Sequence, residues 1–432
     1  MTPLLWAVGV LIAGAIVVLL LTPFIGRRAW RATGLALPFA LAAAIVGLTQ
    51  TPPPGSLAVV ALCGVACIAL LLLPLLETEV PTHVAEAAAL LLLGTAGAIA
   101  LAGATDLLWT VVALETLALS AVTLVALGAG DRSLEAAFKY FVLGAMSLAG
   151  LLYGVGLVYL GTGSFQFPTA EQIAASPLTL VGVVLIGLGL AFELALFPLH
   201  WGALDAYTAA APALAGYVMS ASKLAAAFVL GRLVLAAGAE LAQVFIWIGS
   251  LTIVWGTFGA LAQANNLRRM LAYSAITHAG FIGLALGCGP GGPTAAVFYA
   301  ATYGSMAMLV FAALAGRRDD ADIRASGPAR ALALGLGLFS LSGIPPTPGF
   351  WAKLAVLVVA WQAAGPLPTL IAVAGGVFSV LYYLRPLPDL FAALRSGEIT
   401  PRPLLAPGVV VATLAVVVIG LVPGLVWSLA RG

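Results

Sequence analysis

Residues 211–236 read APALAGYVMSASKLAAAFVLGRLVLA, an apolar stretch as long as a membrane span with one lysine, Lys223, near its centre. The other two lysines also lie in apolar segments, Lys139 in LEAAFKYFVLGAMSLAG and Lys353 in TPGFWAKLAVLVVAW. A charge near the bilayer centre costs roughly 2.5–3.5 kcal/mol on insertion scales. Buried lysine can give up its proton, whereas arginine stays charged. These three amines therefore indicate groups that gain and lose protons inside a membrane.

The composition of the whole chain fits a protein dissolved in lipid. Of its 432 residues, 62% are hydrophobic and only 8% are charged, and the mean hydropathy is +1.14. Soluble domains carry about 25% charged residues. The net charge of +2 favours neither nucleic acid nor an acidic partner. We expect an all-α polytopic membrane protein, with a retained first span because the first arginines follow the first apolar run.

Fourteen apolar segments are long enough to be transmembrane helices. They cover residues 4–24, 31–49, 56–75, 86–104, 106–128, 136–160, 178–200, 211–236, 241–262, 269–287, 293–315, 328–364 as one broken span, 366–386 and 404–430. No connecting loop is long enough to hold a soluble domain.

The arginines predict the orientation of these spans. If the loops alternate between the two sides, one side receives 13 of the 18 basic residues: Arg27, Arg28, Arg31, Arg132, Arg268, Arg269, Arg317, Arg318, Arg324, Arg330, Arg385, Arg395 and Arg402. Besides the lysines, only Arg232 and Arg431 lie elsewhere. The positive-inside rule places the arginine-rich loops in the cytoplasm and both termini outside.

Two segments interrupt their helices in a similar way. FPLHWGALDAYTAAAP (197–212) has prolines and a glycine around His200 and Asp205, and SGIPPTPGFWAK (342–353) has three prolines just before Lys353. Broken backbone at membrane depth is tolerated inside protein or beside a water-filled cavity. Paired interruptions in two halves of a chain point to inverted repeats with functional sites at the breaks. Ordinary proline kinks are the simpler explanation.

Five ionisable residues are expected near mid-membrane: Glu115, Glu193, Lys223, His278 and Lys353. For example, Glu115 follows Asp106 by nine residues, about 13 Å at helical rise, in a hydrocarbon core about 30 Å thick. Together these groups can form a row along which protons pass, with water in the gaps.

Simpler explanations remain open for several of these residues. Lys139 follows Asp131 by only eight residues, so its amine can snorkel to the cytoplasmic surface. His278 can be a core histidine with satisfied hydrogen bonds. His200 and Asp205 can simply cap backbone groups at the break. For Glu115, Lys223 and Lys353 packing alone is a weaker explanation, because leucine would pack at lower cost.

Other chemistries find little support in the sequence. Three histidines leave few options for a haem held by two histidines: His83, His200 and His278. The three cysteines, Cys63, Cys67 and Cys288, lack metal-ligand spacing and are expected to pack in the core. We find no nucleotide-phosphate loop and no hydrolytic triad.

Four ordered motifs carry a family resemblance. The stretches EAAFKYFVLGAMSLAG, GLAFELALFPLHWGALDAYTAAAP running to SASKLAAAF, NNLRRMLAYSAITHAGF and LSGIPPTPGFWAK resemble the antiporter-like membrane subunits of complex I, and the KYFVLGA segment is most similar to the subunit N type. The similarity runs from about residue 90 to 390. It implies proton translocation coupled to quinone reduction elsewhere in the complex.

The resemblance also implies an arrangement of the spans. It predicts fourteen helices, with helices 1–3 in residues 1–85 and two inverted five-helix repeats in 86–236 and 237–390. Helix 14 follows in 391–432, and the seventh and twelfth helices are discontinuous.

Family positions map onto single residues of this chain. Glu115 matches the glutamate of the fifth helix, Lys139 the lysine of the KYF motif, Lys223 the lysine of the eighth helix and Lys353 that of the twelfth. The family usually has lysine where this chain has Glu193. Two carboxylates at close range cannot both ionise cheaply, so one stays protonated or Lys139 or Lys223 supplies a counter-charge. The Trp-Pro-Asp run after the histidine is also altered, to WGALDAY.

The resemblance implies partners as well. Other membrane subunits of complex I, including neighbouring antiporter-like subunits, are expected beside this chain in a bacterial inner membrane. Quinone, FMN and iron–sulfur clusters are expected in partner subunits, and no cofactor or metal in this one. The alternatives are a subunit of a multi-subunit Na⁺/H⁺ antiporter, a membrane-bound hydrogenase subunit, a scaffold without transport, or a solute permease.

Overall fold

A computed structural model describes residues 2–25, 28–52, 54–76, 83–128, 130–263, 265–316, 327–395 and 406–431. All regular elements in these ranges are helices, which confirms the all-α prediction. Those of the first half are α1 (Thr2–Ile25), α2 (Ala29–Gln50), α3 (Gly55–Leu76), α4 (Val84–Ala102), α5 (Leu107–Ala126), α6 (Asp131–Thr162), α7 (Ala170–Ala175), α8 (Pro177–Leu194), α9 (Trp201–Ala209) and α10 (Pro212–Ala237). Those of the second half are α11 (Ala239–Ala262), α12 (Leu267–Leu286), α13 (Gly292–Leu314), α14 (Pro328–Ser342), α15 (Pro348–Ala363), α16 (Pro366–Leu384), α17 (Leu387–Arg395), α18 (Pro407–Leu421) and α19 (Pro423–Arg431).

Eleven of the described helices are long and apolar enough to cross a membrane. The pair α18 and α19, bent by 79°, makes a twelfth if it counts as one span. The difference from the expected fourteen lies in α12, which begins with two arginines, and in residues 328–363, where α14 and α15 have only 15 and 16 residues. A count of fourteen therefore stays a prediction, as does the inverted-repeat arrangement. Arg27, Arg317, Arg318, Arg324 and Arg402, used above for orientation, lie outside the described residues.

Both expected interruptions are present as breaks between helices. α8 ends at Leu194, and Ala195 takes a left-handed conformation (φ 61°) before α9 begins at Trp201. α14 ends at Ser342, and Gly343 is again left-handed (φ 85°) before α15 begins. The left-handed residues close the ends of the helices: the Ala195 N–H donates to the carbonyl of Phe192 at 2.8 Å, and the Gly343 N–H to that of Ser340 at 3.1 Å.

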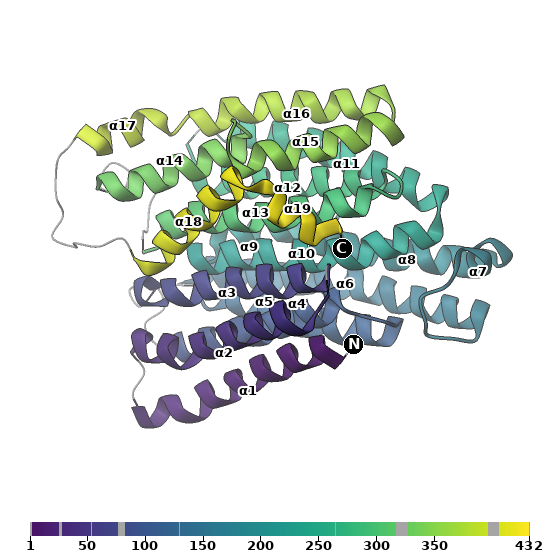
Figure 1. Cartoon of the computed structure of the whole chain (residues 1–432), viewed down its shortest axis with the longest axis horizontal. Helices are drawn as coiled ribbons and strands as arrows, with labels where there is room; N and C mark the ends of the chain where they lie inside the picture. The colour runs from purple at the N-terminus through teal and green to yellow at the C-terminus, as the bar shows by residue number, and fades with distance from the viewer. Residues whose placement is uncertain are drawn as a thin grey trace.

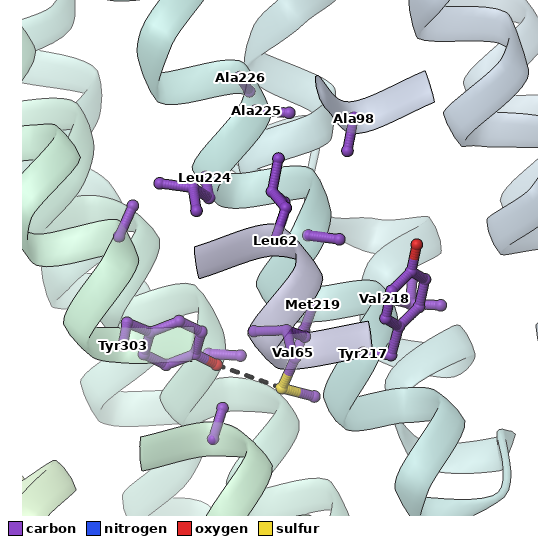
Figure 2. Close-up of a cluster of buried hydrophobic side chains, with 14 of the residues drawn as sticks. Leu62, Val65, Ala98, Tyr217, Val218, Met219, Leu224, Ala225, Ala226 and Tyr303 are labelled. Carbon is purple, nitrogen blue, oxygen red and sulfur yellow. Dashed lines mark hydrogen bonds between the residues drawn. The ribbon is translucent and has the colours of Figure 1, made fainter. Parts of the chain in front are cut away.

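The breaks lie against the most buried part of the bundle. α13 is buried along its whole membrane-length window and α10 over 89% of it. Figure 1 shows these two helices in the middle, with α1 to α5 on one side and α14 to α17 on the other. Figure 2 shows how tightly this centre is packed: Leu62 and Val65 of α3 lie beside Met219 of α10, whose sulfur accepts a hydrogen bond from the Tyr303 hydroxyl at 3.2 Å. A polar side chain on α10 or α13 is thus held away from lipid.

Candidate functional site

Lys223 lies near the middle of α10 and has no exposed surface. Its ammonium nitrogen Nζ donates to the Tyr207 hydroxyl at 3.2 Å. Nζ also lies 4.8 Å from the centre of the Tyr207 ring and 5.8 Å from that of the Tyr303 ring. Tyr207 comes from α9, directly after the first break, and Tyr303 from α13. The ring faces stabilise a cation where water is excluded, so the amine has a place to hold a proton.

Glu193 lies in the last turn of α8, two residues before the break, and is 3% exposed. Its Oε2 has no hydrogen-bond partner among the described residues. α8, which carries Glu193, packs against α10, which carries Lys223. Whether one carboxyl stays protonated or a lysine supplies a counter-charge stays a prediction, although Lys139 is paired with Glu135 and Asp205.

Glu115 lies near the middle of α5 and is only partly buried. It lines a cavity of about 170 Å³ between α5, α6 and α8, together with Tyr140, Phe141 and Phe192. Phe192 precedes Glu193 in the chain. Of the two carboxylates, Glu115 is the one that lines this cavity.

His278 of α12 is held by two tyrosines. Its Nδ1 lies 2.7 Å from the Tyr299 hydroxyl, and its Nε2 lies 3.0 Å from the Tyr383 hydroxyl. The Tyr383 hydroxyl also hydrogen-bonds to Ser274. A neutral imidazole has one donor and one acceptor nitrogen, so one tyrosine donates to the ring and the other accepts from it. The histidine is thus a buried residue with satisfied hydrogen bonds, within a chain that runs from Tyr299 through the ring to Tyr383 and Ser274.

Lys353 of α15 is 8% exposed and lies across the second break. Its Nζ donates to the backbone carbonyl of Ser342 at 2.6 Å and to the Ser379 hydroxyl at 3.0 Å. Nζ also lies 5.9 Å from the centre of the Phe281 ring. Ser342 is the last residue of α14, whose C-terminus carries a partial negative charge. The broken helix therefore supplies the partner of the amine.

Aromatic rings connect the two lysines through the histidine. The Tyr303 ring faces Lys223 and lies 4.9 Å from the His278 ring. On the other side, Phe281 stacks on Tyr299 at 5.6 Å and faces Lys353. The structure thus brings Lys223, His278 and Lys353 into one succession, whereas no such contact joins Glu115 or Glu193 to it among the described residues.

Sequence reasoning missed the polar groups that hold this succession together: Tyr207, Tyr299, Tyr303, Ser342, Ser379 and Tyr383. One signal was available. Tyr299 and Tyr303 are four residues apart in an otherwise apolar segment, which places both on one helix face.

Lys139 does not join these groups in the described contacts. Its side chain is 49% exposed and lies 2.6 Å from Glu135 and 3.4 Å from Asp205. Asp205 in turn contacts Arg269 of α12 at 2.6 Å. These contacts favour the explanation that the Lys139 side chain reaches the surface. Lys139 belongs to a cluster of ion pairs that connects α6, α9 and α12.

The capping explanation of His200 and Asp205 is wrong. His200 makes no capping hydrogen bond to α9, and neither ring nitrogen has a partner among the described residues. Its ring packs against Phe197, Trp201 and Trp255 at centroid distances of 5.7, 5.2 and 5.7 Å. Asp205 is used in the ion cluster. The thiols of Cys63, Cys67 and Cys288, which the sequence predicts to pack in the core, are free and buried.

Residues 104–379 match the family model described as NADH:quinone oxidoreductase/Mrp antiporter, TM. Several curated relatives are named NADH-quinone oxidoreductase subunit N. That of Methylobacterium nodulans is 36% identical over 76% of this chain and 72% of its own length. That of Deinococcus radiodurans is 33% identical over 81% of this chain and 77% of its own length.

Solved structures match the whole fold. A chain of respiratory complex I from Thermus thermophilus matches with a TM-score of 0.80 and 29% identity, over 99% of this chain and all of that one. A chain of the Mrp complex from Dietzia sp. matches with a TM-score of 0.80 at 21% identity, over 99% of this chain and 94% of that one, a likeness of fold alone.

Proposed function

Because the chain belongs to the NADH:quinone oxidoreductase/Mrp antiporter transmembrane family, we propose that it is a proton-translocating subunit in the membrane arm of a respiratory NADH:quinone oxidoreductase. The names of the curated relatives and the match to a complex I chain support this assignment. In this assignment the redox chemistry, with its quinone, FMN and iron–sulfur clusters, takes place in partner subunits. The chain contacts neighbouring membrane subunits in the cytoplasmic membrane, with both termini outside.

The proposed route starts at the first break. A proton enters from the cytoplasmic side, reaches the region of Glu115 and Glu193, and is taken up by the Lys223 amine. It then passes by His278 to Lys353 and leaves outward. Between successive groups of this route that lie beyond hydrogen-bonding range, bridging water completes the path.

One observation carries this proposal: His278 is hydrogen-bonded through both ring nitrogens. Its ring lies 4.9 Å from that of Tyr303, which faces Lys223, and 5.7 Å from that of Tyr299, which stacks on Phe281 beside Lys353. A neutral imidazole can accept a proton at one nitrogen and release one at the other. The tyrosine hydroxyls on each side can both donate and accept. Each transfer conserves charge, because an ammonium becomes an amine as the next group becomes protonated.

The driving signal enters at Glu115. A neighbouring subunit that shifts charge beside this carboxylate changes the proton affinity of Lys223 through Glu193. Moving one charge through 100 mV is worth about 2.3 kcal/mol, and a change of one unit in a pKa is worth about 1.36 kcal/mol. The free energy of the charge movement is therefore comparable to that of the change in proton affinity.

The test is the number of protons pumped per quinone reduced by the assembled complex in sealed vesicles. Lys223→Ala and Lys353→Ala are each expected to lower that ratio while the complex still assembles. An unchanged ratio in either variant would show that the route is wrong. Loss of assembly alone would instead support a scaffold role.

A sodium/proton antiporter subunit is the competing function, because the matching family model covers both kinds of protein. Vesicles that contain this chain but no quinone reductase distinguish them. Sodium-dependent proton exchange in such vesicles would favour the antiporter.

A further inference from the structure

A second cavity, of about 360 Å³, lies at the end of the bundle where α1 begins and α19 ends. Among its lining residues are Leu4, Phe228, Arg232, Leu235, Val297 and Arg431. None of the lining residues is acidic. The cavity is thus an apolar hollow with two guanidinium groups, apart from the proposed proton route.

These two arginines are the ones that the orientation argument leaves unexplained. The described contacts confirm that other arginines lie at the opposite end: Arg269 pairs with Asp205, Arg330 donates to the carbonyl of Ala315 at the end of α13, and Arg385 donates to that of Gln263 at the end of α11. Apart from the lysines, the only basic residues outside the arginine-rich loops therefore converge on one cavity.

Both arginines are positioned by the fold. The Arg232 guanidinium donates to the carbonyl of Ala102 at 3.0 Å and lies 5.5 Å from the Phe167 ring. Arg431 is the last residue of α19. This helix is bent by 79° from α18, and its end lies at the cavity. None of the ion pairs found among the described residues involves either arginine. One carbonyl uses one of the five donors of a guanidinium, so Arg232 keeps capacity for an anion.

Two helix starts add to the positive potential of the cavity. Gly55 begins α3, and Pro293 and Thr294 lie in the first turn of α13; all three line the cavity. The first turn of a helix carries a partial positive charge, which adds to the charge of the two guanidinium groups. Such helix starts bind phosphate groups.

We propose that this cavity binds the phosphate group of an anionic phospholipid in the leaflet on the side of the chain termini. Arg232 and Arg431 contact the phosphate, and the apolar wall of Leu4, Phe228, Leu235 and Val297 covers the adjoining carbons. Free phosphate would leave that apolar wall without a partner, whereas a lipid matches both parts. A volume of about 360 Å³ falls within the range of small-molecule sites, which is enough for a headgroup and its first carbons.

The experiment uses the complex purified in detergent through a tag on this chain. It is delipidated and titrated with phosphatidylglycerol, phosphatidylcholine or inorganic phosphate, and bound lipid is counted by native mass spectrometry. We expect the wild type to bind phosphatidylglycerol in preference to phosphatidylcholine. Arg431→Gln is expected to weaken that binding at least about tenfold, since a charge-assisted contact is lost.

Matched variants keep the result interpretable. Arg431→Gln leaves the Arg232 contact with Ala102 intact, so the test does not depend on an Arg232 variant that misfolds. Arg395→Gln removes the same charge at the end of α17 and is expected to bind as the wild type does. Equal binding of both lipids, or equal loss with Arg395→Gln, would overturn the proposal. Inorganic phosphate that displaces phosphatidylglycerol at equal concentration would overturn the lipid as the occupant.

Discussion

The Lys353 ammonium lies 2.6 Å from the carbonyl oxygen of Ser342, the residue at which α14 ends. The chain can bring these two together because Gly343 turns the backbone with a φ of 85° and has no side chain. A Cβ atom on Gly343 would lie 2.9 Å from Cδ of Lys353 and 3.3 Å from its Nζ. The break in the second half of the chain is thus shaped around the lysine that follows it.

Gly343→Ala is therefore expected to displace the Lys353 side chain and lower the proton-to-quinone ratio. Left-handed backbone costs an alanine about 1–2 kcal/mol, so some stability is lost as well. Gly163→Ala is the matched control, because Gly163 is also left-handed (φ 69°, ψ 11°) but has nothing within 4 Å of the added Cβ. Pumping that falls equally in both variants would show that backbone strain, and not the lysine, is responsible.

Tyr207→Phe removes the hydroxyl that accepts from Lys223 and keeps the ring beneath the amine. We expect slower pumping with assembly preserved, because the amine loses the hydroxyl to which it donates. Tyr217→Phe on α10 is the control. It removes a buried hydroxyl that is hydrogen-bonded to Thr95 at 2.9 Å rather than to the amine of Lys223. Losing such a bond costs about 1 kcal/mol of stability. Proton release after a flash or an oxidant pulse measures the pumping rate of both variants. Equal rates in the two variants would exclude a role for the Tyr207 hydroxyl.

Tyr299→Phe and Tyr383→Phe each break one side of the His278 bridge. If protons pass through the ring, either change interrupts the same path, so the double variant is expected to be about as slow as the slower single one. Tyr217→Phe again serves as control, since it removes a buried hydroxyl whose bond to Thr95 lies apart from His278. Additive losses in the double variant would indicate two separate roles for the tyrosines.

The burial of Lys223 and Lys353 and the positions of the two breaks could be predicted from the sequence. Charged residues within apolar runs and clustered prolines are local features, and both survive in the fold at Lys223, Lys353 and the ends of α8 and α14. The tyrosine contacts could not be predicted, because they depend on which faces α9, α12, α13 and α16 turn towards each other.

Lys139 shows a different limit. Its apolar neighbours Phe138 and Phe141 are 68% and 47% exposed, since α6 lies at the edge of the bundle. An apolar residue that faces lipid or a partner subunit cannot be distinguished by composition from one that faces the core. The same sequence pattern thus led to a buried position for Lys223 and to an exposed ion pair for Lys139.

Lys139→Ala is accordingly expected to lower pumping much less than Lys223→Ala. Exposed ion pairs contribute about 0–1 kcal/mol, so the loss of its contacts with Glu135 and Asp205 should change stability little. Asp205→Asn affects two cations at once and is expected to loosen the contact between α9 and α12 more. Thermal unfolding of the complex at low and high salt measures the difference. A pumping defect in Lys139→Ala as large as that in Lys223→Ala would return Lys139 to the proton route.

The family resemblance implies a lysine where this chain has Glu193, and a pair of substitutions tests what the site needs. Glu193→Gln keeps the shape but removes the charge that faces Lys223, so it is expected to slow pumping strongly. Glu193→Lys restores the family residue and a partner for Glu115, and is expected to retain more activity than Glu193→Gln even though it adds a cation near Lys223. Glu240→Gln, at the start of α11, controls for the loss of one acid. Proton-to-quinone ratios that are equal in the two Glu193 variants would mean that the charge at this position does not matter, and the signal from Glu115 would then have to reach Lys223 by another path.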